Sequence, residues 1–184
     1  NATPAAVDAL IQNLTYQNSS DNPTASRTLG ITVTDGDGGS TGQQTLDINV
    51  TGSNDAPVLT NQDNITFAEN TVNATPQIVD SAVSLTDIDS ADFDGGQATF
   101  TFTSNGSTAD QLSIRNEGTG AGQIGFDGTN ITFGGTTIGT INGANNGSNG
   151  TDLVIDFNAN SSPAAVDALI QNLTFQNTSD THTS

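Results

Sequence analysis

The stretch LTDIDSADFDGG carries four aspartates within eight positions and no Lys or Arg: Asp87, Asp89, Asp92 and Asp94. Carboxylates that close repel one another unless a cation lies between them. Alternate residues of an extended chain point to the same side, so Asp87 and Asp89, after a predicted strand, would direct their carboxylates toward one point. Ca²⁺ takes about six to eight oxygen ligands and tolerates irregular loops. The spacing therefore predicts a calcium site.

Other metals and the short calcium motifs fit the chain less well. Mg²⁺ requires stricter octahedral geometry and is second choice. Zinc and copper prefer imidazole or thiolate, and the chain has no Cys and one histidine, His182. An EF-hand loop beginning at Asp35 would have Leu46 where a glutamate is needed, and the tandem GGxGxDxUx pattern is missing. Calcium ligands are therefore expected from separate segments of the chain.

The overall charge excludes several classes of partner. The 184 residues include Lys+Arg 2 and Asp+Glu 20, a formal net charge of −18. Such a surface repels nucleic acid and anionic membranes, and its self-repulsion favours bound cations. No apolar run approaches the roughly 20 residues that a membrane-spanning helix needs. We expect no nucleic-acid partner and no membrane insertion.

Short apolar runs between Gly-, Asn- and Asp-rich turns predict strands. Leu29, Ile31 and Val33 alternate with polar residues, DGDGGS turns the chain, and the alternation resumes from Leu46 to Val50, which is typical of a hairpin. Similar runs at regular spacing predict an all-β fold, a β-sandwich or barrel. The further predicted strands cover residues 65–67, 83–85, 100–102, 112–114, 124–126, 131–133, 138–141 and 154–157.

An internal repeat organises the chain. Residues 160–184 repeat residues 1–25 at an offset of 159, with 18 of the 25 positions identical. A gapless match of this length predicts that the chain is a slice of a tandem array. The predicted modules are residues 1–52, the C-terminal part of one repeat, and residues 58–184, the following repeat without its last two strands. A linker at residues 53–57 separates them.

The repeated block is predicted to form one short helix that covers an end of the sandwich. Thr3 or Ser162 would cap it, and a proline follows each at the first helical position. Apolar residues recur at spacings of three and four and form one face of the helix. These residues are Val7, Leu10, Ile11 and Leu14, and their counterparts Val166, Leu169, Ile170 and Leu173.

Three segments resemble the cadherin repeat, in the form found in tandem arrays of giant bacterial surface proteins. FAEN at residues 67–70 resembles the segment that supplies a glutamate ligand. LTDIDS at residues 85–90 resembles the DxD motif. VTDGDGGS at residues 33–40, followed by LDINVTGSNDAP at residues 46–57, resembles the last hairpin and the inter-repeat linker. The ligands implied by this resemblance are Glu69, Asp87 and Asp89, Asp35 in the hairpin, and Asn54 and Asp55 in the linker.

The resemblance implies an Ig-like β-sandwich with calcium held where modules join, although the mid-domain DxE motif of cadherins has no match. Counting strands places Glu69 at the far end of its module. The near end would hold Asp87, Asp89, Asp92 and Asp94 beside Asn54 and Asp55. Asp35 and Asp37 would belong to the site of the preceding junction.

The resemblance also implies a function. It predicts a non-enzymatic structural repeat of an extracellular or cell-surface protein, such as an adhesin stalk or a matrix or filament component. The alternative is a carbohydrate- or surface-binding module, although the chain has no Trp and one Tyr to form a sugar platform. Neighbouring repeats or other copies are the expected partners, through head-to-tail donation of residues 26–50. Glycans could attach at Asn-x-Ser/Thr sequons, which include Asn13, Asn49, Asn64, Asn130 and Asn172.

Overall fold

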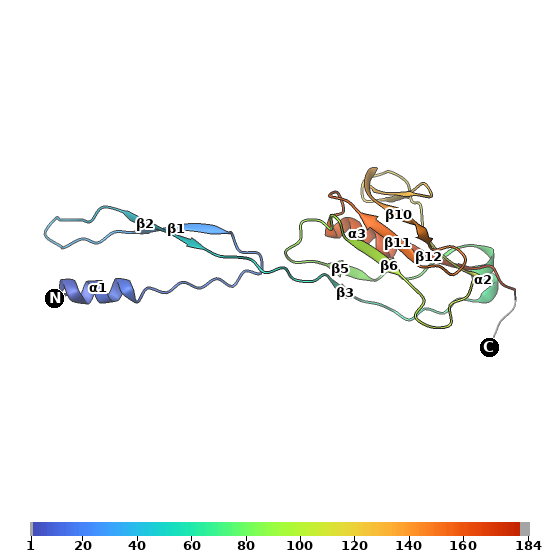
Figure 1. The fold of residues 1–184 in the computed structure, drawn as a ribbon, viewed down its shortest axis with the longest axis horizontal. Coiled ribbons are helices and arrows are strands. Elements are labelled where there is room, and N and C mark those ends of the chain that lie inside the picture. The colour runs from blue at the N-terminus through green and yellow to red at the C-terminus, as the bar shows by residue number, and fades with distance from the viewer. Residues whose placement is uncertain (1, 181–184) are drawn as a thin grey trace. The chain divides into compact units, whose positions relative to one another are not determined.

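The computed structural model describes residues 2–180 (Figure 1). His182, considered above as a metal ligand, lies outside the described residues. The chain divides into two units, Asn1–Asn54 and Asp55–Ser184, and each is described by itself. The division falls inside the predicted linker.

Unit 1 consists of a helix and a hairpin. Helix α1 (Pro4–Gln12) is followed by β1 (Ser26–Ile31), which pairs antiparallel with β2 (Gln44–Asn49). An isolated bridge between Thr34 and Ser40 lies in the connecting loop. This confirms the predicted hairpin.

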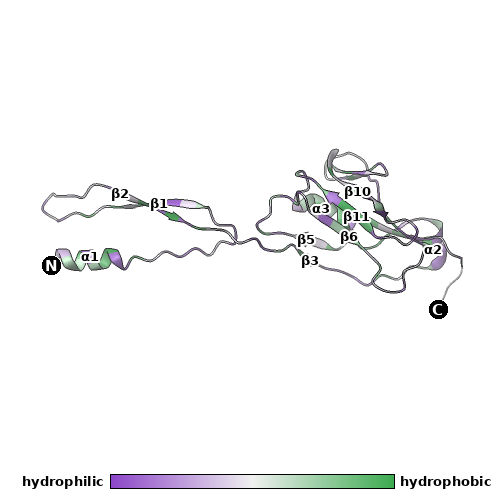
Figure 2. Cartoon of the chain, in the orientation of Figure 1, coloured by the Kyte–Doolittle hydropathy of each residue, from purple (hydrophilic) through white to green (hydrophobic). Residues whose placement is uncertain are grey.

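None of the described residues of unit 1, 2–54, is buried, so they form no apolar core. No residue of α1 is buried, and Leu10, Leu14 and Leu46 are 73%, 59% and 45% exposed. Figure 2 shows the resulting apolar stretches on α1 and β2. A two-stranded hairpin is marginally stable alone in water, because it has nothing against which to bury its apolar face.

Unit 2 holds three antiparallel sheets. The largest has the strand order β6-β11-β10-β9-β8, the second the order β4-β12-β7, and β3 pairs with β5. The predicted all-β character is therefore confirmed. The strands are β3 (Val58–Thr60), β4 (Gln77–Ile78), β5 (Ser84–Thr86), β6 (Gln97–Phe100), β7 (Asp110–Ile114), β8 (Ile124–Phe126), β9 (Asn130–Phe133), β10 (Thr136–Asn146), β11 (Leu153–Phe157) and β12 (Leu173–Asn177).

The turn between β9 and β10 shows how sequence sets strand pairing here. Phe133 lies opposite Thr136, which leaves Gly134 and Gly135 as a two-residue loop. Their φ angles are +59° and +83°. Tight hairpin loops of this kind need positive φ at both central residues, which glycine adopts without steric cost.

One apolar cluster joins the two larger sheets to helix α3 (Pro163–Gln171). The helix contributes Ala165, Val166 and Leu169, which are 0%, 3% and 0% exposed. The strands contribute Leu112, Ile114, Ile124, Ile131, Ile138, Leu153, Ile155, Phe157 and Leu173.

In unit 2 the repeated block folds as a helix followed by a strand, so for this copy the prediction of a single helix was wrong at its end. Ser162 accepts a hydrogen bond from the Ala165 N–H and caps α3 as expected. The helix stops at Asn172, whose side-chain amide donates to the carbonyl of Ala168. Leu173 then lies opposite Ile114 in β12, because apolar residues at 173 and 175 also alternate as a strand requires.

The segment after β3 also departs from the prediction. A strand was expected at residues 65–67, but β3 ends at Thr60 and no strand follows before helix α2 (Glu69–Ala74). The described part of unit 2, residues 55–180, therefore has two helices where one was predicted. Val72 is the buried residue of α2, and Glu69 in its first turn interacts favourably with the helix dipole. None of the described helices has the length and apolarity needed to cross a membrane.

The two copies of the helix give a matched test of packing. Leu169 is fully buried, whereas Leu10 occupies the same position in the repeat and is 73% exposed. Leu169→Ala is expected to lower the free energy of unfolding of unit 2 by about 2–5 kcal/mol. Leu10→Ala should change it by less than about 0.5 kcal/mol. Urea unfolding followed by circular dichroism measures both, and equal losses would contradict the burial difference.

Candidate metal site

The pairing of β3 with β5 brings the start of unit 2 close to the aspartate loop. Val58 lies opposite Thr86, so the residues before β3 and those after β5 emerge at the same edge. There the N–H of Asp55 donates to Oδ2 of Asp89 at 3.0 Å. Strand counting predicted this meeting of two segments more than thirty positions apart.

Asp87 fixes the turn that follows β5. Its Oδ1 accepts from the N–H of Asp89 at 3.3 Å and of Ser90 at 3.1 Å. Desolvation raises the pKa of Asp87, but these hydrogen bonds outweigh it and the net shift is downward. The backbone after β5 therefore turns at Asp87 and does not continue as an extended strand. Asp87 therefore holds its own loop, and the expected convergence of alternate extended residues does not describe it.

Asp89 has one oxygen without a partner. Its Oδ2 receives the Asp55 N–H, while its Oδ1 is buried and accepts no hydrogen bond. A buried, unsatisfied carboxylate oxygen costs free energy unless a donor or cation reaches it. This atom is the strongest structural indication of a ligand at the loop.

Asp92 and Asp94 lie on either side of an anchoring phenylalanine. Phe93 packs beside Phe157, with ring centroids 6.2 Å apart, and its N–H donates to the carbonyl of Ser161 at 3.0 Å. Oδ1 of Asp92 accepts from the Asp94 N–H at 3.0 Å. The loop is thus attached to the core while Asp94 stays exposed.

The remaining predicted ligands lie elsewhere. Glu69 begins α2, at the end of unit 2 opposite the start of β3, as strand counting expected (Figure 1). Asn54 is the last residue of unit 1 and is exposed. In the β1–β2 loop, Oδ1 of Asp35 accepts from the N–H groups of Asp37 and Gly39 at 2.9 and 2.8 Å. Asp35 is therefore engaged in holding its turn.

No three His, Cys, Asp or Glu side chains among residues 2–180 gather in a geometry that could hold a metal ion. The donors of the aspartate loop are all oxygens, which suits a hard cation such as Ca²⁺. The buried Oδ1 of Asp89 fits a cation ligand. Asp89 would be the carboxylate that holds such an ion, and backbone carbonyls and water would supply its other ligands.

Several carboxylates that sequence reasoning passed over have structural roles. Asp167 of α3 accepts the Leu85 N–H at 2.6 Å and so attaches the helix to β5. Asp80 accepts the N–H of Asp63 at 2.9 Å, and Asp110 accepts that of Ser107 at 2.7 Å. The donors to Asp167 and Asp80 lie 82 and 17 positions away in the sequence, so no local pattern signals these two roles.

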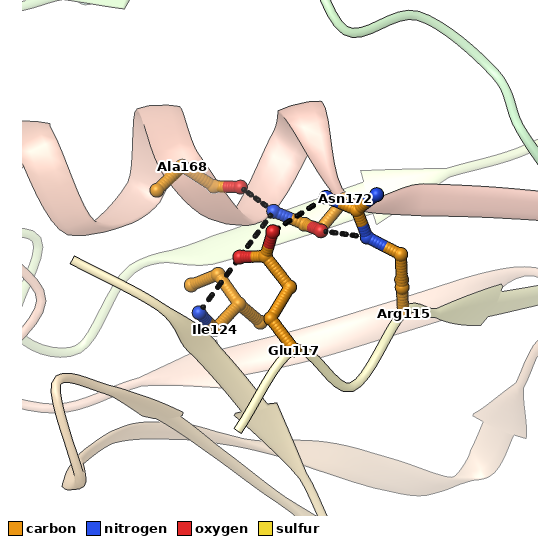
Figure 3. Close-up of polar contacts among 5 residues, drawn as sticks. All are labelled: Arg115, Glu117, Ile124, Ala168 and Asn172. Carbon is orange, nitrogen blue, oxygen red and sulfur yellow. Dashed lines mark hydrogen bonds and ion pairs between the residues drawn. The ribbon is translucent and has the colours of Figure 1, made fainter. Parts of the chain in front are cut away.

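A polar network ties β7 to the end of α3 (Figure 3). Arg115 forms an ion pair with Glu117, and its Nε donates to Oδ1 of Asn172 at 2.7 Å. Glu117 Oε2 accepts from the Ile124 N–H and from Asn172 Nδ2. Asn172 belongs to a sequon but is 4% exposed, so folded unit 2 does not present it for glycosylation. Its counterpart Asn13 keeps the bond within the helix, to the carbonyl of Ala9.

Comparison of the chain with family models, with curated proteins and with solved structures gives no match.

The Asp35 turn gives a pH prediction. Hydrogen bonds from the N–H groups of Asp37 and Gly39 hold the pKa of Asp35 below its usual value of 3.8. A carboxyl whose pKa is lowered by folding contributes stability above its unfolded pKa, and that contribution disappears as the pH falls through the lower folded value. In chelator, the amide NMR shifts of Asp37 and Gly39 should titrate with a midpoint below 3.8. They should stay flat in Asp35→Asn, and a midpoint at or above 3.8 would contradict the geometry.

Proposed function

We propose that the chain is a non-enzymatic structural repeat of a long extracellular or cell-surface protein, such as an adhesin stalk, a matrix protein or a filament. Each module is an Ig-like β-sandwich of the cadherin-like kind, and Ca²⁺ bound at the junctions stiffens the array. The extracellular assignment rests on the resemblance of the hairpin, linker and DxD segments.

One observation carries the repeat part of this proposal. The nine-residue helix PAAVDALIQ occurs twice with identical sequence, in α1 and α3. In unit 2 its apolar face is packed in the core, and in unit 1 the same face is exposed. An amphipathic helix gains most of its stability from packing that face. This supports unit 1 being the same part of a module as α3 and its surroundings.

The calcium part rests on the loop after β5. Asp55, in the linker, already donates to Asp89, and the second oxygen of Asp89 is buried without a partner. A cation held by this carboxylate would fix the linker against unit 2. It would also offset part of the −18 net charge, whose self-repulsion opposes compactness.

Calcium titration tests the proposal. Ca²⁺ at about one hundred times its dissociation constant should add about 2.7 kcal/mol to the free energy of unfolding. Isothermal titration and thermal unfolding in calcium or chelator measure this, with Mg²⁺ as the competing ion. Asp89→Asn should remove most of the effect.

Asp127→Asn is the matched control. Asp127, in the β8–β9 turn, accepts backbone N–H bonds from Thr129 and Asn130, so the substitution removes the same charge from another turn that lacks an unpartnered buried oxygen. The control should retain the full calcium response. If both variants lost the calcium response equally, the response would be general screening of charge and not binding at Asp89. If the parent chain showed no calcium response, the calcium assignment would be overturned.

A further inference from the structure

The β1–β2 hairpin has one apolar face and one polar face. Cross-strand partners share a face, so Leu29 and Leu46, which lie opposite each other, project with Ile31 and Ile48 to one side. The other side is polar, and there Thr28 Oγ1 donates to Asp47 at 2.8 Å. The alternation is that of a strand pair with a core on one side. Unit 1 supplies no such core.

Unit 2 contains an apolar groove of complementary character. Its volume is about 560 Å³, and its lining is mainly apolar. Phe175 of β12 lines the groove together with Phe67 and Phe102, and its ring centroid lies 6.3 Å from that of Phe67 and 5.8 Å from that of Phe102. Ile65 and Phe102 on the rim are 42% and 38% exposed. Among the described residues this is a large aromatic surface with nothing packed over it.

The strand at the groove has a free edge. Phe100 of β6 lines the groove, and β6 pairs with β11 on one side and with no strand of the described chain on the other. An open edge beside an apolar groove is a site where a further strand can add, with main-chain hydrogen bonds to the edge and side chains in the groove.

The internal repeat identifies the occupant. In unit 1 the hairpin follows residues 1–25, and the copy of that block in unit 2 supplies α3 and β12, including the groove residues Leu173 and Phe175. The repeat pattern therefore predicts that a hairpin like β1–β2 packs next to β12, the strand that lines the groove. Arg27 lies on its apolar face opposite Ile48, and Asp63 lines the groove, so the two surfaces also carry opposite charges.

We propose that the groove of unit 2 binds the β1–β2 hairpin of a second copy of this chain. Donor and acceptor are different surfaces, so the contact is heterologous and propagates head to tail into an open filament. The inference rests on the tandem-repeat part of the proposed function and not on calcium.

Complementation between two blocked variants tests this. Leu46→Asp disables the hairpin and leaves the groove intact, while Phe102→Asp disables the groove and leaves the hairpin intact. Each change should weaken self-association by on the order of a hundredfold, because it places a charge in an apolar contact. By analytical ultracentrifugation in chelator, the parent chain should form concentration-dependent polymers, each variant alone should be monomeric, and their mixture should give a dimer that grows no further.

Matched controls carry the same charge next to the altered positions. Thr45→Asp lies on the polar face of β2, and Thr103→Asp lies beside Phe102 without lining the groove. Both should polymerise as the parent chain does. A parent chain that stays monomeric at its highest soluble concentration would overturn the proposal, and so would a mixture of the blocked variants that does not dimerise.

A second readout applies if an aspartate variant loses its circular dichroism signal. The chain has no cysteine, so Leu46→Cys in one chain and Ile65→Cys in another can form only an engineered disulfide. Oxidation should link these two chains far more than a pair that carries Thr45→Cys in place of Leu46→Cys. Equal linkage would overturn the inference. Polymerisation without any calcium response would leave it standing and overturn only the calcium assignment.

Discussion

The structure depends on a single constraint: carboxylates that have almost no cations to pair with are stabilised by hydrogen bonds from backbone N–H groups and neutral side chains. Asp35, Asp87 and Asp127 each accept two backbone N–H bonds in a turn, and each has a lowered pKa. For Asp35 these bonds are the main cause, for Asp87 desolvation opposes the hydrogen bonds without cancelling them, and for Asp127 the side-chain amide of Asn130 contributes most, followed by the backbone bonds. A carboxylate that accepts hydrogen bonds within its own loop fixes the conformation of the turn. The same hydrogen bonds favour its ionised form. Arg115, one of the two cations, is placed where it joins β7 to the end of α3.

The duplicated helix separates local preference from packing. Both copies have a capping hydroxyl, Thr3 or Ser162, and a proline in the first turn. In both, the asparagine after the helix donates a side-chain hydrogen bond to a carbonyl of the last turn. What differs is the surroundings of the apolar face, which is covered by two sheets in unit 2 and by nothing in unit 1. The local sequence thus determines where the helix begins and ends. Most of the stability that Leu169 contributes comes from its packing against the surrounding strands.

The sequence correctly predicts the elements that a local pattern of residues specifies. Strand alternation located the β1–β2 hairpin and the strands near β9 and β10, and antiparallel pairing placed Asp55 near Asp89. It missed α2, whose single buried residue, Val72, leaves no apolar periodicity to detect. It also extended the helix through Leu173, because that spacing suits a helix and a strand equally. The use of Asp87 by its own turn depends on backbone angles that composition does not reveal.

The short ladder between β3 and β5 has a mechanical consequence. Only three residue pairs join these strands, and Val58 and Leu59 are 53% and 48% exposed, so little apolar contact supports them. Tension transmitted through the linker would enter unit 2 at this ladder and peel β3 away while the main cluster stayed folded. The segment around β3 would extend first. The two sheets that pack against α3 would bear the load only after that segment was fully extended.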